Sequence, residues 1–445
     1  MSEGTREHWS SSLGFTLAAV GSAVGLGNMW RFSYMTAENG GAAFVILYVL
    51  LTAIVGLPVM LVELSIGRGA GESPVKALTY YGGRAWAPLG LLFVVSGFVI
   101  LGYYGVLAGW TTRYAFEAIV TGFPADAAAH FGVLQSGHQA AAWQLGFMAL
   151  TVLVVSGGVR GGIERASLVL MPLLGLLVIG LALYAATLDG AAAGYRYYFS
   201  TEFKAILDPA VMRDAAGQAF FSLSLGMGAM LTYASYLSRS HDLPREAILI
   251  SASDFAVAFV AGLVVFPLVF ALGLQQDVSA STLGALFVTL PKAFATMGFA
   301  GRVIGFLFML ALVVGALTSA ISLLEVVVST AIDQFGMERA RASWLCGGAI
   351  SALGLLSAYD IGILGLMDTI GGNLLLVFGG LCLSVFAGWV LGPRILEEAE
   401  QGTRMPWMLG GWLFMLRYVV PPLLFVILLY SIQAAWVALA EWAGG

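Results

Sequence analysis

The chain is dominated by a succession of apolar segments, and most are long enough to cross a lipid bilayer. A transmembrane helix needs about 20 predominantly apolar residues, and eleven segments meet or approach that length. They cover residues 13–37, 43–68, 87–121, 142–158, 166–186, 216–238, 243–274, 300–333, 343–358, 361–391 and 411–441. Only 10% of the residues are charged, against about 25% in an average soluble protein. The sequence therefore predicts an all-α integral membrane protein with eleven transmembrane helices.

The distribution of Lys and Arg predicts how these helices are oriented, because short cytoplasmic loops carry the excess of positive charge. With a cytoplasmic N-terminus, the cytoplasmic loops hold Arg68, Lys76, Arg84, Arg160, Arg165, Arg239, Arg245, Arg339, Arg341, Arg394 and Arg404. The opposite loops hold fewer, namely Arg196, Lys204, Arg213 and Lys292. An odd number of spans then places the C-terminus outside. We expect one membrane domain over residues 1–445, and a surface helix at 281–294, where Pro291 and Lys292 interrupt an apolar pattern.

Several classes of protein are disfavoured by what the sequence lacks. Cys346 and Cys382 both fall in apolar segments, which favours buried small hydrophobes over a disulfide framework or a metal site. The N-terminal run MSEGTREHWSSS does not have the pattern of a cleavable signal peptide. The four histidines lie in tails or loops, at positions 8, 130, 138 and 241. No Glu-x-x-His or Gly-x-Ser-x-Gly arrangement appears in a span, and nothing resembles a basic surface for nucleic acid, so we expect neither an enzyme nor an organic cofactor.

Two of the predicted spans are interrupted by glycine and polar residues at mid-membrane. The first contains GSAVGLGNMWRF (21–32), and the sixth contains FFSLSLGMGAMLTYASY (220–236). The sixth span comes five spans after the first, and because five is odd, a repeat of spans 1–5 as spans 6–10 would be inverted in the membrane. We place the repeats at about 10–190 and about 210–392, with an extra span at about 411–441. Paired interruptions at corresponding positions of two halves point to the binding site of a transporter.

Unwound backbone is tolerated at membrane depth where it lines a cavity or is buried in protein. There it offers carbonyl groups to a hard cation such as sodium, and helix N-terminal N–H groups to a carboxylate. An amino acid together with sodium ions would use both. The alternative for each single glycine is that it allows two helices to pack closely.

Four runs of sequence carry a resemblance to a known family: REHWSSSLGFTLAAVGSAVGLGNMWRF, ENGGAAF, FFSLSLGMGAMLTYASY and GALTSAISLLE. Together they resemble the neurotransmitter:sodium symporter family, in its bacterial amino-acid branch, which includes the bacterial leucine transporter and related transporters of hydrophobic amino acids that have 11 spans. The resemblance implies an inverted five-plus-five repeat with broken helices 1 and 6. It also implies alternating access driven by the sodium gradient, with two sodium ions as coupling ions.

The resemblance implies two sodium sites. The first would use the Ala23 carbonyl, Asn28, Ser222 and Asp254, and the second would use the carbonyls of Gly21, Val24 and Gly315 with the hydroxyls of Thr318 and Ser319. The family commonly has Asn where this chain has Asp254. Animal members bind chloride beside residues that correspond to Tyr48, Gln218 and Ser222, so an ionised Asp254 implies transport without chloride. The alternative is that Asp254 only hydrogen-bonds a neighbouring helix.

The resemblance also implies a substrate pocket. Its residues are Ala23, Gly25, Leu26, Gly27, Ile100, Tyr104, Phe221, Ser222, Ser224, Met227, Ser319 and Leu323. The N–H groups of Leu26 and Gly27, the Tyr104 hydroxyl and the first sodium would meet the substrate carboxylate. The carbonyls of Ala23, Phe221 and Ser222 and the Ser224 hydroxyl would meet the amine. Monoamine members have Asp at the position of Gly25, which argues for an amino acid here, and Met227 between two glycines favours a pocket that accepts large aliphatic and aromatic side chains.

Two gates are implied in the same way. Arg31 and Asp368 would form the outer gate, with Tyr104 and Phe221 as a lid beneath it. Arg6 and Asp333 would form the inner gate, supported by Tyr236 and Trp9. Glu63 matches a family carboxylate near the inner end of the second span, whereas Glu325 has no assigned role.

The sequence thus predicts a sodium-coupled symporter that imports hydrophobic L-amino acids across a bacterial cytoplasmic membrane, as a monomer or weak dimer in the lipid bilayer. Two alternatives stay open within the same fold: proton coupling, with Asp254 or Glu325 titrating, and an amino-acid receptor that does not transport. An ion channel is disfavoured because each motif occurs once in the chain, whereas channels usually repeat their filter segments around a symmetric pore.

Overall fold

The structure is a computed structural model that describes residues 7–274 and 282–444. Within these ranges the chain is helical, and the sole β-type pairing is an isolated bridge between Gly41 and Thr201. The short elements labelled η are π-helical or 3₁₀ turns. Several of them join two α-helices into one longer span.

The first half of the chain forms α1 (Ser12–Ala23), η1 (Gly27–Arg31), α2 (Phe32–Glu38), α3 (Ala42–Leu51), η2 (Thr52–Gly56), α4 (Leu57–Ala70), α5 (Pro74–Gly82), η3 (Arg84–Trp86), α6 (Ala87–Val120), α7 (Ala127–Leu134), α8 (His138–Ser156), η4 (Val159–Glu164), α9 (Arg165–Ala185) and α10 (Ala191–Phe199). The second half forms η5 (Phe203–Leu207), α11 (Pro209–Ser222), α12 (Ala229–Ala234), α13 (Leu243–Ala271), α15 (Thr282–Gly284), η6 (Ala285–Thr289), α16 (Leu290–Thr296), α17 (Gly298–Phe335), α18 (Arg339–Tyr359), α19 (Ile361–Met367), η7 (Asp368–Leu375), α20 (Leu376–Val385), η8 (Phe386–Leu391), α21 (Pro393–Glu400), α22 (Pro406–Phe414), η9 (Met415–Val419) and α23 (Val420–Gly444).

The number of spans differs from the predicted eleven. In the described residues, nine continuous helices are long and apolar enough to cross a membrane, or ten if the bent pair Ser12–Ala23 and Gly27–Glu38 is one span. The predicted sixth span explains the difference. It is divided into α11, with 14 residues, and α12, with 6 residues, so neither piece reaches the length that a continuous span needs. The count of eleven is therefore not confirmed, although the predicted break in this span is present.

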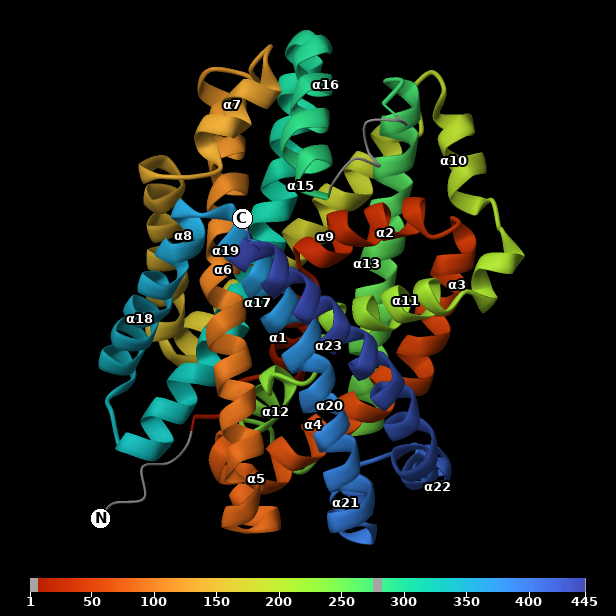
Figure 1. The fold of residues 1–445 in the computed structure, drawn as a ribbon. Coiled ribbons are helices and arrows are strands. Elements are labelled where there is room, and N and C mark those ends of the chain that lie inside the picture. The colour runs from red at the N-terminus through yellow and green to blue at the C-terminus, as the bar shows by residue number, and fades with distance from the viewer. Residues whose placement is uncertain (1–6, 275–281, 445) are drawn as a thin grey trace.

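The long helices run between two ends of the molecule (Figure 1). α6 and α17 lie near the middle, and α8 and α18 flank them on one side. The apolar window of α17 is 72% buried, whereas that of Pro406–Ala443 is only 28% buried. The protein core therefore surrounds α17, and the C-terminal helix lies at the periphery, where it packs on α20.

The connecting segments gather at the two ends of this bundle. In Figure 1, α5 and α21 lie at the lower end, whereas α7, α10 and α16 lie at the upper end. The lower end carries Lys76 and Arg394 from the positively charged set of loops, and the upper end carries Arg196 and Lys292 from the other set. The two sets of loops therefore lie at opposite ends, as the sequence predicts. The boundaries of the two repeats stay a prediction.

The predicted surface helix at 281–294 lies within a short apolar unit that ends at Thr296. Pro291 does not interrupt a helix, because it occupies the first turn of α16, where a missing N–H group costs nothing. Phe287, Leu290 and Phe294 are buried. This helix therefore packs one face against the protein instead of lying free on the surface, and residue 281 lies outside the described residues.

Candidate functional site: a cavity between two broken helices

The first broken helix is formed by α1 and η1. α1 ends at Ala23, and Val24 takes up an extended conformation with φ −78° and ψ 111°. The chain then continues as η1 and α2, at an angle of 53° to α1. The Asn28 side-chain oxygen accepts a hydrogen bond from the Gly25 N–H group at 3.0 Å. The polar residue that follows the glycines therefore stabilises the unwound segment from within the chain.

The second broken helix is formed by α11 and α12. Six residues between them are not helical, and Ser224, Gly226 and Gly228 have positive φ angles of 54°, 79° and 73°. Ser224 is the single non-glycine residue with positive φ in the described part of the chain. Such strain is typical of functional sites. The buried carboxylate of Glu63 on α4 accepts hydrogen bonds from the backbone N–H groups of Gly226 at 2.9 Å and Leu231 at 3.2 Å, and so fixes the start of α12.

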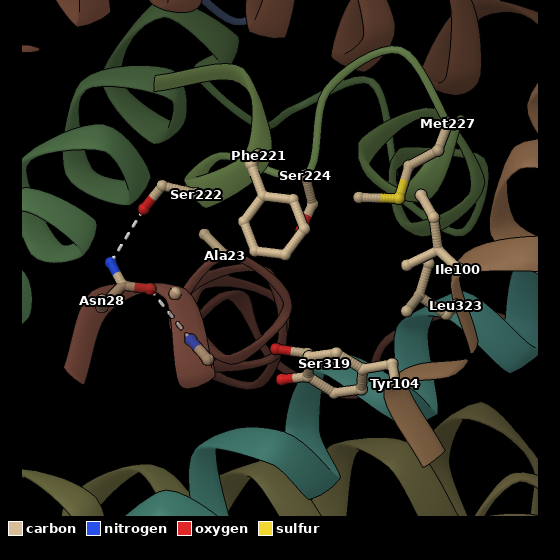
Figure 2. Close-up of a pocket in the computed structure, with 12 residues that line it drawn as sticks. Ala23, Asn28, Ile100, Tyr104, Phe221, Ser222, Ser224, Met227, Ser319 and Leu323 are labelled. Carbon is tan, nitrogen blue, oxygen red and sulfur yellow. Dashed lines mark hydrogen bonds between the residues drawn. The ribbon is translucent and has the colours of Figure 1, made fainter. Parts of the chain in front are cut away.

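A small cavity lies between the two breaks (Figure 2). It is lined by Ala23, Gly25, Gly27, Asn28, Ile100, Tyr104, Phe221, Ser222, Ser224, Met227, Ser319 and Leu323. Eleven of the twelve predicted substrate residues are in this set, and the twelfth, Leu26, lines the adjoining cavity. The structure therefore brings the residues of the predicted pocket together, although the role of these residues in binding stays a prediction.

The two ends of this cavity differ in chemistry. Figure 2 shows Asn28 and Ser222 at one end and Ile100, Met227 and Leu323 at the other. The cavity volume is about 30 Å³, which is room for water but not for an amino acid. Any larger ligand therefore requires movable side chains such as Met227 to shift.

Polar groups converge on Asp254, which is fully buried on α13. Tyr48 donates to one carboxylate oxygen at 2.8 Å, and the Ser222 hydroxyl lies 2.8 and 2.9 Å from the two oxygens. The Asn28 side-chain nitrogen donates to Asp254 at 2.6 Å and to Ser222 at 2.9 Å. The side chain of Gln218 donates to the Gly27 carbonyl at 3.2 Å beside this cluster. Three of the four residues predicted for the first sodium site, Asn28, Ser222 and Asp254, are therefore in direct contact, and the fourth, Ala23, lines the same cavity as Asn28 and Ser222.

A second group of oxygen atoms lies where α1 meets α17. The Ser319 hydroxyl is 3.4 Å from the Gly21 carbonyl, 3.3 Å from that of Val24 and 3.2 Å from that of Gly315. The Thr318 hydroxyl is 3.0 Å from the Gly315 carbonyl. All five residues predicted for the second sodium site therefore converge, and every atom in the group is a neutral oxygen.

A larger cavity, of about 460 Å³, adjoins the small one. Gly27, Tyr104 and Phe221 line both, so these residues separate the two spaces. Arg31 and Asp368 line the larger cavity, yet no ion pair within 4.0 Å joins them in the described structure.

Arg31 is held in another way. Its guanidinium stacks over the Phe221 ring, at 4.9 Å from the ring centroid, and donates to Asn373 at 3.3 Å. The predicted outer gate is therefore not closed in this conformation. Closing it requires the Arg31 side chain to leave Asn373 for Asp368.

The opposite side of the small cavity is sealed by aromatic packing. The Trp9 indole donates to the Tyr233 carbonyl at 2.9 Å and makes edge contacts with the rings of Phe15, Tyr233 and Tyr236. Asp333 accepts a hydrogen bond from the Ser73 N–H group at 2.7 Å. Its predicted partner Arg6 lies outside the described residues, so that pair stays a prediction.

Glu325 has partners that the sequence did not indicate. Its buried carboxylate accepts from the Tyr236 hydroxyl at 2.6 Å and from Arg339 at 2.8 and 3.1 Å. Arg339 also pairs with Glu7 at 3.3 Å. The spacing of 14 residues between Glu325 and Arg339, across a turn at Gly336, is the signal that could have revealed the pair. No comparable spacing in the sequence indicates that Asn373 would contact Arg31.

Two broken helices that face each other across a cavity, inside a bundle of membrane-length helices, define a secondary transporter of the broken-helix class. A model of the sodium:neurotransmitter symporter family matches residues 6–139 and 128–439, and the chain belongs to this family.

Curated relatives and a solved structure agree with this assignment. The chain is 35% identical to an uncharacterized sodium-dependent transporter of Methanocaldococcus jannaschii over 95% of its length and 90% of the relative's. It is also 35% identical to the uncharacterized sodium-dependent transporter YhdH of Bacillus subtilis, over 96% and 98%. The crystal structure of MhsT in complex with L-phenylalanine superposes with a TM-score of 0.87, at 40% identity over 96% of this chain and all of the other. The protein is therefore a sodium-dependent transporter of this family.

Proposed function

We propose that the protein imports hydrophobic L-amino acids together with sodium ions, without a requirement for chloride. The observation that carries this proposal is the cavity between the two breaks, with polar groups at one end and apolar side chains at the other. An amino acid with a hydrophobic side chain likewise has polar groups at one end, the amine and the carboxylate, and an apolar group at the other. The likeness to MhsT, which was crystallised with L-phenylalanine, supports the same class of substrate.

The unwound segment of the first helix is suited to the substrate carboxylate. The Tyr104 hydroxyl already accepts a hydrogen bond from the Leu26 N–H group at 3.3 Å. A carboxylate entering between them would receive donors from Leu26, Gly27 and Tyr104 in a region that excludes water. The carbonyls of Ala23, Phe221 and Ser222, with the Ser224 hydroxyl, would accept from the amine. Gly25 supplies no carboxylate of its own, which favours a substrate that brings one.

The two oxygen clusters are suited to sodium, a hard cation that prefers oxygen ligands. In the second cluster no side chain has to turn to present an oxygen atom. Carbonyl and hydroxyl oxygens alone come from its five residues, Gly21, Val24, Gly315, Thr318 and Ser319. In the first cluster the Asn28 amide turns its nitrogen toward Ser222 and Asp254. Binding of sodium there requires this amide to present its oxygen instead. We propose one ion in each cluster.

Asp254 supports independence from chloride. The groups that would bind chloride in animal members correspond to Tyr48, Gln218 and Ser222. Here the hydroxyl groups of Tyr48 and Ser222 contact the Asp254 carboxylate. A fixed carboxylate would supply the negative charge that balances sodium. An additional anion would then be repelled.

We further propose that the lower end in Figure 1 faces the cytoplasm of a bacterial cell, with the N-terminus inside and the C-terminus outside. This orientation follows from the excess of Lys and Arg in the loops of that end.

The large cavity then opens toward the outside, and Trp9 and Tyr236 close the inner side. With this orientation the conformation is outward-facing, because Arg31 and Asp368 line the large cavity without forming an ion pair in the described structure. A monomer or weak dimer stays our expectation for the oligomeric state.

Uptake of labelled amino acids into proteoliposomes tests this proposal. A panel that includes leucine, phenylalanine, alanine and glutamate is offered with a sodium gradient, with potassium, and with sodium in chloride-free buffer. We expect uptake of leucine and phenylalanine with sodium, whether or not chloride is present. Equal uptake in potassium, driven by a pH gradient, would favour proton coupling, and sodium-dependent binding without uptake would identify a receptor.

A further inference from the structure

Arg417 is a charged residue within a membrane-length helix that the transport site does not use. It lies in η9, inside the apolar helix Pro406–Ala443. Its Nε atom donates to the Gly388 carbonyl at 2.6 Å, and its guanidinium lies 5.9 Å from the centroid of the Trp389 ring. These contacts orient the guanidinium but do not neutralise its charge.

The remaining two nitrogen atoms of this guanidinium have no protein acceptor in the described ranges. No carboxylate among those residues forms an ion pair with Arg417 within 4.0 Å. Charged side chains at membrane depth are costly and are normally paired. The buried Arg68 pairs with Glu398, and the half-buried Arg339 pairs with Glu325, whereas Arg31 and Arg417 have no such carboxylate partner in the described residues. Arg417 is therefore a half-buried cation whose two Nη groups are open to an anion from outside the protein.

A groove of about 530 Å³ begins at Arg417 and runs between α20 and α23. It is lined by Trp86, Leu381, Cys382, Val385, Arg417, Pro421, Pro422 and Phe425. Apart from Arg417 these side chains are apolar, and Phe425 is 53% exposed at the periphery. Because Pro406–Ala443 is one of the two least buried spans in the described residues, the groove faces the region that lipid occupies. Its shape and chemistry suit an acyl chain beside one positive charge.

Arg417 also lies at the level where lipid headgroups are expected. The α20–η8 helix ends at Leu391, three residues after the carbonyl that Arg417 contacts. Trp389 is 58% exposed and makes an edge contact with Tyr418, and exposed Trp and Tyr mark the membrane–water interface. This is the end that carries the positively charged loops.

We propose that Arg417 and this groove bind an anionic phospholipid, with the lipid phosphate on the guanidinium and one acyl chain along the groove. The two free Nη groups offer the paired donors that a phosphate accepts. Basic pockets between helices at the cytoplasmic side favour anionic headgroups. The apolar lining selects a lipid over a free phosphate ion, which gains nothing from Leu381, Val385 or Phe425. This inference is independent of the transported substrate.

Native mass spectrometry of the purified, delipidated protein tests the proposal. The protein is mixed with equal amounts of phosphatidylglycerol and phosphatidylcholine that carry identical acyl chains. We expect wild-type protein to retain phosphatidylglycerol about fivefold more strongly, as one nearby basic side chain provides. Arg417→Gln should lose this preference while keeping a donor for the Gly388 carbonyl, and Arg417→Lys should retain much of it. Arg394→Gln, which removes an exposed charge from the same end, is the matched control and should behave as wild type.

Other outcomes would overturn the proposal. Equal retention of the two lipids by wild-type protein would show that the groove does not select charge, and this comparison does not depend on any variant folding. Unchanged preference in Arg417→Gln would place the selective site elsewhere. Displacement of bound phosphatidylglycerol by an equal concentration of glycerol phosphate would identify a site for free anions instead.

Discussion

The hydroxyl group of Tyr48 on α3 donates a 2.8 Å hydrogen bond to the carboxylate of Asp254 on α13, and both side chains are fully buried. Ser222, at the end of α11, and Asn28, in η1, also contact this carboxylate. One acidic side chain thus joins both broken helices to two continuous ones. A change of charge at this point should affect ion binding more than the fold around it.

Replacing Asp254 by Asn tests whether its charge substitutes for chloride. The amide nearly matches the carboxylate in size but leaves the donors of Tyr48 and Ser222 without an anion. We expect uptake in chloride-free buffer to fall about tenfold or more, since hydrogen bonds to a charged group contribute about 1.5–3 kcal/mol each. Addition of chloride should restore part of the rate. The measurement is initial uptake into proteoliposomes with chloride or gluconate as the anion.

Tyr48→Phe is the control for this experiment, because it removes one donor and keeps the carboxylate. Its uptake should fall modestly and stay independent of chloride. If Asp254→Asn transported at the wild-type rate without any chloride, the carboxylate would not serve as the internal anion.

The breaks in the two helices were predictable because their cause is local. Gly25 and Gly27, and then Gly226 and Gly228, lie within four residues of a polar side chain in otherwise apolar segments, and the positive φ angles at Gly226 and Gly228 favour glycine. The helical class and the positions of most spans also follow from hydrophobic length alone. The convergence of residues from distant spans on one cavity did not follow from composition or spacing, and was expected only through the family resemblance.

Other features could not be predicted because they depend on contacts between distant segments or on conformation. Nothing near Arg31 in the sequence indicates that Asn373 holds it away from Asp368. The unpaired Arg417 is likewise a consequence of which helices lie beside it. The predicted count of eleven includes the sixth as one broken span, whose two helical pieces in the structure are each too short to count as a continuous span.

Gly25 should tolerate no side chain. A β-carbon at this position would lie 2.7 Å from the Ser319 hydroxyl and 2.9 Å from the Tyr104 hydroxyl, and crowding of this kind costs about 1–3 kcal/mol. Both hydroxyls belong to the proposed ligand sets, so Gly25→Ala should weaken amino-acid binding about tenfold. Scintillation proximity or calorimetric titration with leucine measures this change. Gly175→Ala, where a β-carbon meets nothing within 4 Å, should bind as wild type, and equal affinity of both variants would contradict the proposed pocket.

Thr318 should contribute to sodium affinity through its hydroxyl. Thr318→Val keeps the shape and removes one oxygen, so we expect the sodium concentration for half-maximal uptake to rise about tenfold, the effect of losing one polar contact of about 1.4 kcal/mol. Thr111→Val is a close match, because Thr111 is also buried and also bonds a carbonyl of its own helix, that of Leu107. A similar sodium dependence in the two variants would show that Thr318 only packs its helix.

Arg339 should be needed for stability because Glu325 is fully buried. Loss of one partner of a buried ion pair leaves an uncompensated charge and costs about 3–5 kcal/mol. Arg339→Gln should therefore lower the midpoint of thermal unfolding strongly, whereas Arg341→Gln, two residues away and exposed, should not. The double variant Glu325→Gln/Arg339→Gln should regain most of the lost stability, because two neutral amides can bond each other and the Tyr236 hydroxyl. If the double variant unfolded at the same temperature as Arg339→Gln alone, the Arg339 side chain would stabilise the fold through its packing and not through its charge.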